Sequence, residues 1–159
     1  MLRDLPPDQK LKFKYKLKQH GIAMLVQRLE TALLAMQNAQ DSANNDTKST
    51  VGDKHETTRA MGHLDNEMNA RQMEEAQHEL AFLNSINVSE IYKQATIGAV
   101  VVCRHAMFFI ASGIGTQQVA EEKIIFISPK APLSMQLLNK RKGERFTFNG
   151  VDFIIEEVF

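Results

Sequence analysis

Apolar residues recur at helical spacing in the early part of the chain. The first set lies four, three, four and three residues apart and comprises Ile22, Val26, Leu29, Leu33 and Met36. This is the heptad spacing of a seam along one helix face, where apolar side chains meet a partner helix. The residues around it are mainly Ala, Leu, Met, Gln and Glu, which favour helices. The pattern predicts one long helix.

A second seam runs between Thr57 and Asn84. Its members are Met61, Leu64, Met68, Met73, Ala76, Leu80 and Leu83, and its phase slips by one residue between Met68 and Met73. Such a slip predicts that the seam drifts around the helix surface or that the coiled coil is locally over- or underwound. The polar stretch Asp41–His55 separates the seams, so we expect two antiparallel helices joined by a polar tip. Half of a helical bundle, or a coiled coil that dimerises through these seams, would give the same periodicity.

The segment from Lys10 to Lys18 alternates lysine with Leu, Phe and Tyr, a period of two that is typical of a half-buried strand. Lysine and leucine favour helices, however, and Pro6-Pro7-Asp8 is a typical helix start. We therefore predict the first turns of the first helix here, with Leu11, Tyr15 and Lys18 on one side. The lysines would then form either a solvated basic face or a local contact with a partner.

Beyond residue 88 the composition changes to Val, Ile and Phe in short runs broken by Gly, Asn and Pro, which is typical of strands. Asn149-Gly150, flanked by apolar residues, predicts a type I′ hairpin turn. Further strands are expected at Thr96–Cys103, Ala106–Ser112 and Lys123–Ser128, and a short helix at Pro132–Asn139.

These elements predict an α+β fold in two parts. An antiparallel helical hairpin, or coiled coil, is expected over residues 1–88, with an acidic tip near 41–57. A small antiparallel β domain with one short helix is expected over 89–159. The chain carries no motif of a phosphate-cradling glycine loop, because Gly113-Ile114-Gly115 is better interpreted as a loop between strands.

Composition limits the possible functions. The chain has 159 residues, with 19 Lys and Arg against 19 Asp and Glu, and its formal net charge is zero. Nucleic-acid binding by a generally basic surface is therefore not supported, and any such contact must be local. Cys103 is alone, so we expect no intramolecular disulfide and a reducing compartment, and its apolar neighbours favour a buried structural thiol. Apolar runs such as Ala99–Cys103 and Ala106–Ala111 are far too short to span a membrane, and we expect a cytoplasmic protein.

Carboxylates gather near the tip. Asp53 and Glu56 are three residues apart, so on a helix they face the same way. Such a pair forms an open, weak site for a hard cation such as Mg²⁺. The pair could complete the shell of an ion that another protein already half holds, and that ion could polarise a water for attack on a phosphodiester. Alternatively, acidic residues in a first helical turn simply cap the amides and favour the helix dipole.

Two parts of the chain, the tip motif and the C-terminal region from Ser128 onward, resemble a known family, the GreA/GreB transcript-cleavage factors. The segment from Gly52 to Thr57 resembles the family's tip motif Gly-Asp-x-x-Glu-Asn. The segment from Ser128 to Leu133 resembles its Ser-Pro-x-Ser-Pro-hydrophobic sequence, and Leu137 to Glu144 resembles its Leu-Leu-Gly-Lys-Lys-x-Gly-Asp. The closing strand Phe153–Val158 also resembles the end of the family. In architecture the resemblance covers nearly the whole chain.

The resemblance implies a bacterial transcription elongation factor, monomeric and not itself an enzyme, that activates RNA polymerase. An FKBP-like β domain would dock near the secondary channel of polymerase, and the segment with Ser128, Pro129, Pro132 and Leu133 would serve that docking. The coiled coil would enter the channel, close to the nascent RNA 3′ end and to DNA. Asp53 and Glu56 would help to hold the second catalytic Mg²⁺ for cleavage of backtracked RNA. Lys54 and Arg59 could steer RNA phosphates, although no motif match supports them.

Some positions depart from the family pattern. Thr57 stands where the family has Asn, Ala131 where it has Ser, and Asn139 where it has Gly. These departures leave open a Gre-like regulator that occupies the secondary channel and modulates or inhibits transcription without stimulating cleavage. A structural coiled-coil protein that dimerises through its seams is the third alternative.

Overall fold

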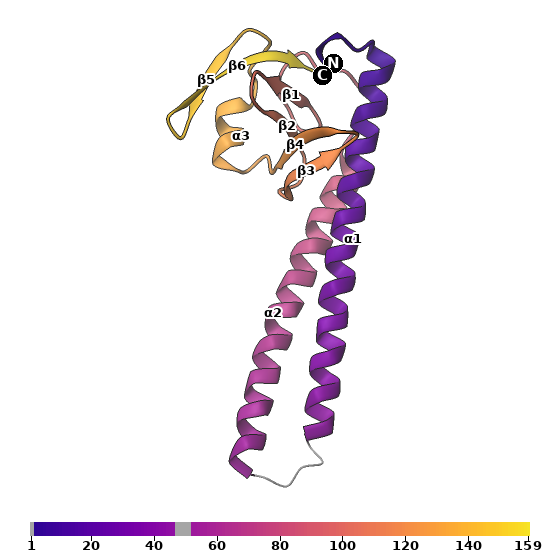
Figure 1. Ribbon diagram of the computed structural model, residues 1–159, viewed down its shortest axis with the longest axis vertical. Helices are drawn as coiled ribbons and strands as arrows, with labels where there is room; N and C mark the ends of the chain where they lie inside the picture. The colour runs from indigo at the N-terminus through magenta and orange to yellow at the C-terminus, as the bar shows by residue number, and fades with distance from the viewer. Residues whose placement is uncertain (1, 47–51) are drawn as a thin grey trace. The chain divides into compact units, whose positions relative to one another are not determined.

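The computed structural model describes residues 2–46 and 52–159, with the backbone alone described at 43, 45, 46, 52–56, 58 and 59. It has a helical hairpin followed by a mostly antiparallel sheet with one short helix, so the predicted fold class is confirmed (Figure 1). The chain divides into two compact units, one formed by Met1–Ala23 with Ala81–Phe159 and the other by Met24–Leu80. The domain boundary expected at residue 88 stays a prediction. No helix within the described residues is long and apolar enough to cross a membrane.

Two long helices form the hairpin. After a short 3-10 helix η1 at Leu2–Asp4, helix α1 spans Pro7–Asp46 and helix α2 spans Gly52–Ser85. Proline at the first position of α1 fits there because that residue needs no amide donor. The lysine-rich segment is helical, as predicted. Helix continues further toward the tip on both sides than the polar stretch Asp41–His55 had indicated, because polar side chains do not prevent helix formation.

One side of the lysine-rich segment is buried, but it is not the side that carries Tyr15. The buried residues are Phe13, Lys14 and Leu17, whereas Tyr15 is 58% exposed. One helical turn further, Gly21 lets α1 approach closely. A Cβ atom at this position would lie 2.8 Å from Cδ2 of Leu83 and 3.2 Å from the ring of Phe126.

The seam of α1 in the unit Met24–Leu80 keeps the predicted members Leu29 and Met36, which are half-buried, but at two other positions it is displaced by one residue. Leu25 and Ala32 are buried, seven residues apart, and Leu29 between them is half-buried. The predicted seam members Val26 and Leu33 are instead 37% and 48% exposed. The prediction followed apolar character alone, and at these two places the chain offers adjacent apolar residues, Leu25 beside Val26 and Ala32 beside Leu33, so the sequence pattern does not decide which of each pair faces α2.

The seam of α2 keeps a constant phase, so the predicted slip is wrong. Seven buried or half-buried positions follow strict heptad spacing, with half-buried Ala70, Glu79 and Phe82 flanking them, and these seven are Gly62, Asn66, Asn69, Met73, Ala76, Leu80 and Leu83. The apolar stripe formed by Met61, Leu64 and Met68 lies outside the seam, and these side chains are 63%, 60% and 58% exposed. The seam continues through two asparagines and a glycine, so its phase does not follow the apolar residues alone.

The remaining elements form a six-stranded sheet with the order β3-β4-β2-β1-β6-β5. Neighbouring strands are antiparallel except for β2 and β4, which are parallel. The purely antiparallel sheet that was predicted is thus corrected to a mixed one. The strands are β1 Val100–Cys103, β2 Met107–Ile110, β3 Gly115–Val119, β4 Glu122–Ile127, β5 Arg145–Phe148 and β6 Val151–Val158, and helix α3 spans Pro132–Leu137 between β4 and β5.

Two hairpin turns have the same backbone geometry but very different sequences. Asn149 and Gly150 have φ angles of 51° and 74°, which is the predicted type I′ turn. Ala120 and Glu121 join β3 to β4 with φ angles of 50° and 66°. Strand β3 was not predicted, because Ala-Glu lacks the usual signature of such a turn and the strand itself is polar.

Hydrophobic side chains pack on both faces of the sheet. On one face, Phe108, Ile110, Ile127 and Leu137 belong to a buried cluster that α3 helps to cover. On the other, Phe126 packs edge-on against Phe109 at 5.2 Å between ring centroids. This second face packs against α1, which approaches Phe126 at Gly21.

Candidate functional site

The tip motif coincides with the start of a helix. Gly52 is the first residue of α2, so Asp53 and Glu56 lie in its first two turns. Their side chains, and those of Lys54 and Arg59, lie outside the described part of the structure. Among the residues that are described, no group of three or more His, Cys, Asp or Glu is arranged to hold a metal. The paired-carboxylate Mg²⁺ site therefore stays a prediction.

The segment with Ser128, Pro129, Pro132 and Leu133 forms a tight turn between β4 and α3. The carbonyl oxygen of Ser128 accepts hydrogen bonds from the amide of Ala131 at 3.0 Å and from the hydroxyl of the buried Ser134 at 2.5 Å. The side chain of Leu133 packs against the hydrophobic core, whereas Pro132 is exposed. The turn brings these four predicted residues together, and its role in docking remains untested.

Three lysines on α1 hold the helix to the rest of its unit. Lys10, Lys14 and Lys18 are four residues apart, so they lie on one side of the helix. The ammonium of Lys18 donates hydrogen bonds to the carbonyls of Asn84, at 2.9 Å, and Ile86, at 2.8 Å. These carbonyls lie at the C-terminal end of α2, where carbonyls lack helical partners and attract a positive charge.

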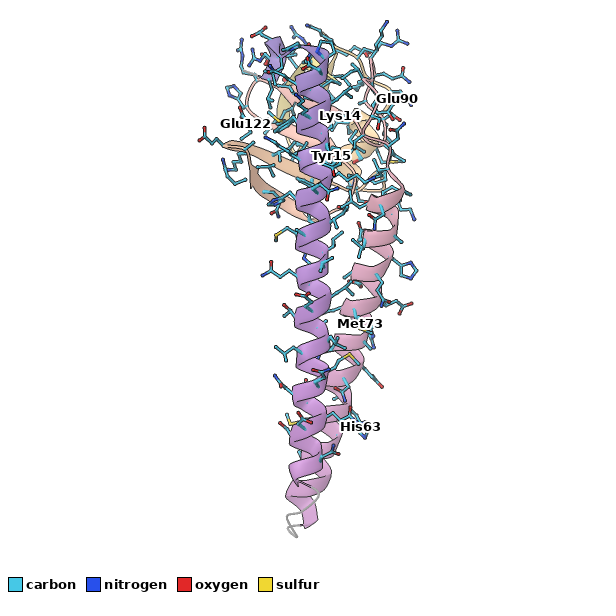
Figure 2. The ribbon with its side chains drawn as sticks, turned by 90° about the vertical axis from the view of Figure 1, so that its right-hand side faces the viewer. Lys14, Tyr15, His63, Met73, Glu90 and Glu122 are labelled. Carbon is cyan, nitrogen blue, oxygen red and sulfur yellow. The ribbon has the colours of Figure 1, made fainter. Side chains whose placement is uncertain are left out.

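Lys10 and Lys14 contact the remaining segments of the same unit. Nζ of Lys10 lies 3.4 Å from a carboxylate oxygen of Glu157 and 5.3 Å from the ring centroid of Phe159. Burial tends to raise the pKa of Glu157, but the amide of Val158 and the charge of Lys10 outweigh it and lower the pKa. A solvated basic face was one of the two expectations for these lysines. Lys14 (labelled in Figure 2) differs most from it, because its side chain is fully buried.

The other two lysines of the segment, Lys12 and Lys16, are exposed and help to line a groove. Two adjoining depressions share Leu2 and Glu122 and have volumes of about 240 Å³ and about 460 Å³. Together we call them the basic groove. Its lining residues are Leu2, Arg3, Leu5, Gln9, Lys12, Phe13, Lys16, Val102, Cys103, Arg104, His105, Ala106, Met107, Ala120, Glu122 and Lys123.

The basic groove was not predicted from the sequence. It is assembled from η1, the first turns of α1, the β1–β2 turn and the β3–β4 turn, which are distant in sequence. The one local signal was the alternation of lysines from Lys10 to Lys18. Two of these lysines, Lys12 and Lys16, do not make the contacts that the other three make. No single segment shows the clustering of charge.

Cys103 is buried, as predicted for a structural thiol. Burial, with a smaller contribution from the charge of Glu156, raises the pKa of its thiol to about 12. A thiol with so high a pKa is almost entirely protonated at neutral pH and is a poor nucleophile. Although Cys103 lines the basic groove, it contributes no reactive group there.

Comparison with known proteins gives one weak structural match. No family model matches the chain, and no curated protein matches it. A solved structure titled "Structure of the transcription factor Gfh1" matches with 15% sequence identity, covering 87% of this chain and 92% of that chain, at a TM-score of 0.37. A likeness with so low a TM-score carries no argument about function.

Proposed function

We propose that this chain is a transcription factor that binds RNA polymerase and stimulates hydrolysis of backtracked nascent RNA. In this proposal the chain has no hydrolytic activity alone. Asp53 and Glu56 complete the coordination of a second Mg²⁺ in the polymerase active site, where the ion lowers the pKa of a water and stabilises the developing charge. Lys54 and Arg59 lie beside these carboxylates in the sequence and are the proposed contacts to RNA phosphate.

The observation that carries the proposal is the location of the tip motif. Helix α2 begins at Gly52, the first residue of the motif, and α1 ends only a few residues before it, at Asp46. Because both helices are long, the motif stands at the end of a hairpin rather than within a globular surface. A carboxylate pair at such an end can enter a narrow site in a partner, and that is the requirement of the proposed mechanism.

The test is an RNA cleavage assay on a stalled, backtracked elongation complex of the cognate polymerase. The chain should shorten the RNA in a Mg²⁺-dependent manner, and D53N/E56Q should reduce the cleavage rate by at least about tenfold, since loss of metal-site groups has effects of that order. The double substitution D65N/E67Q is the matched control. It removes two exposed carboxylates from the same helix and should leave cleavage unchanged. Equal cleavage by D53N/E56Q and wild type would contradict the assignment.

A secondary-channel regulator without cleavage activity is the second candidate. It is favoured by Thr57, which replaces the family's Asn directly after Glu56. Such a factor would slow nucleotide addition in the same assay and leave the RNA length unchanged. T57N distinguishes the two candidates further, because restoring the family residue should produce cleavage only if this departure is what prevents it.

A further inference from the structure

The basic groove concentrates positive charge on a chain whose formal net charge is zero. Lys12, Lys16, Arg104 and Lys123 are exposed, and none of them forms a salt bridge with another described residue. Arg3 is already paired with Glu156 at 2.6 Å. Of the described lining residues, Glu122 alone carries a negative charge. The groove therefore favours an anionic partner.

The cations are held on well-fixed backbone. Lys12 and Lys16 are one turn apart on α1, whose neighbouring side is anchored through Lys14 by a 2.6 Å hydrogen bond to the carbonyl of Glu90. Arg104 lies in the short turn between β1 and β2, which a 2.8 Å hydrogen bond from the amide of Cys103 to the carbonyl of Ala106 closes. Charges on preorganised backbone bind a partner at a lower entropic cost.

The floor of the groove is mainly aliphatic and offers little ring surface for base stacking. Leu2 is 7% exposed and Leu5 is half-buried. Among the described lining residues Phe13 is only 6% exposed, and the one exposed ring is the imidazole of His105, which lines the smaller depression and not the larger one that holds Lys12 and Lys16. Single-stranded nucleic acids bind through exposed aromatic rings together with cations. An apolar floor with a basic rim is better suited to a polypeptide that presents apolar side chains and carboxylates together.

A strained turn forms part of the groove wall. Ala120 and Glu121 both have positive φ angles, of 50° and 66°, which are costly for residues with a Cβ atom. This turn places Ala120 in the larger depression, beside Glu122. A glycine or asparagine would relieve the strain.

We propose that the basic groove docks an acidic, amphipathic segment of a partner protein. The apolar side chains of that segment contact Leu2 and Leu5, and its carboxylates pair with Lys12, Lys16 and Arg104. This inference goes beyond the proposed function, because it needs neither the tip carboxylates nor RNA cleavage. A failure of D53N/E56Q in the cleavage assay would leave it unaffected.

Fluorescence anisotropy of the full-length chain with a short labelled peptide of alternating Glu and Leu tests the proposal. The peptide should bind, and it should be released when salt is raised to about 1 M, where the Debye length is about 3 Å. K12Q/K16Q should weaken binding by about fivefold to thirtyfold, as expected for the loss of two ion pairs. K12R/K16R should retain binding because it keeps both charges.

Matched variants and probes separate the other outcomes. R71Q/K93Q removes two exposed cations away from the groove and should bind like wild type, and L5S should weaken binding through the apolar floor. Circular dichroism should show the same helix content for each variant. Equal binding of a peptide with Gln in place of Glu, no binding at millimolar concentration, or selective binding of single-stranded RNA in place of the peptide would each overturn the proposal.

Discussion

The ammonium of Lys14 lies 4.3 Å from the ring centroid of Tyr92, and it donates a 2.6 Å hydrogen bond to the carbonyl of Glu90. The ring face and the carbonyl both stabilise a positive charge, yet the side chain is fully buried. Burial outweighs the nearby charge of Glu90 and lowers the pKa of Lys14 from 10.5 to about 8. Relative to the charged form, the neutral amine of Lys14 is therefore more favourable in the folded protein than in the unfolded chain.

This difference predicts that Lys14 makes stability depend on pH at alkaline values. Between about pH 8 and 10.5 the unfolded chain binds more protons at Lys14 than the folded chain does, so the free energy of unfolding rises with pH. At about 1.4 kcal/mol for each pH unit between the two pKa values, the gain approaches about 3 kcal/mol. Below pH 8 both states are protonated, and the cost of burying the charge is present in full.

Comparison with K14M isolates this contribution. Other titrating groups, including Cys103, are common to both proteins and cancel in the difference. Urea unfolding followed by circular dichroism, which suits a chain without Trp, should show wild type gaining stability relative to K14M between pH 8 and 10.5. A difference that stays constant over this range would show that the Lys14 pKa is not lowered by folding.

Two glycines on the long helices should respond in opposite directions to the same substitution. G62A should stabilise the chain by up to about 1 kcal/mol, because alanine favours the helix and no described atom lies within 4 Å of the added Cβ. G21A should destabilise it by about 1–3 kcal/mol, the usual cost of overpacking. Its Cβ would lie 2.8 Å from Cδ2 of Leu83. Thermal unfolding measures both, and a stabilising G21A would contradict the close approach.

Features set by local sequence could be predicted, and those set by distant contacts could not. Asn149-Gly150 specifies its turn through backbone preferences, so the hairpin between β5 and β6 followed directly. The phase of the α2 seam depends on what α1 presents to it. Met61 and Met68 were predicted to lie in the seam because they are apolar. They are exposed, and Asn66 and Asn69 occupy the seam instead.

The candidate sites show the same contrast. Asp53 and Glu56 were proposed because they form a short contiguous motif that resembles a family, and their role stays a prediction, although the motif does lie at a helix start, Gly52. The basic groove was missed because Lys12 and Arg104 become neighbours only through the fold. Alternation of lysines could not indicate which of them are buried, since that depends on acceptors such as the carbonyl of Glu90.

The polar residue Asn66 in the α2 seam should limit the stability of the unit Met24–Leu80. Its Oδ1 is buried without a hydrogen-bond partner among the described residues, which costs free energy that an apolar side chain would not. N66L should stabilise this unit by about 1–2 kcal/mol. The control L64Q changes an exposed position and should have little effect. Hydrogen exchange of amides in α2 provides the measurement, and unchanged protection in N66L would contradict a seam position for Asn66.

The thiol of Cys103 should react with alkylating reagents only when the chain unfolds. Its pKa is raised from 9.0 to about 12, so at pH 8 the thiolate fraction in the folded protein is about a thousandfold below that of the unfolded chain. Burial, at 4% exposure, slows access further. Alkylation by iodoacetamide, measured by mass spectrometry, should be fast in urea and very slow in native buffer. The variant C103A, which removes the reactive group, serves as the blank for modification elsewhere. Rapid labelling of the native protein would mean that β1 opens readily, and it would place a reactive thiol at the wall of the basic groove.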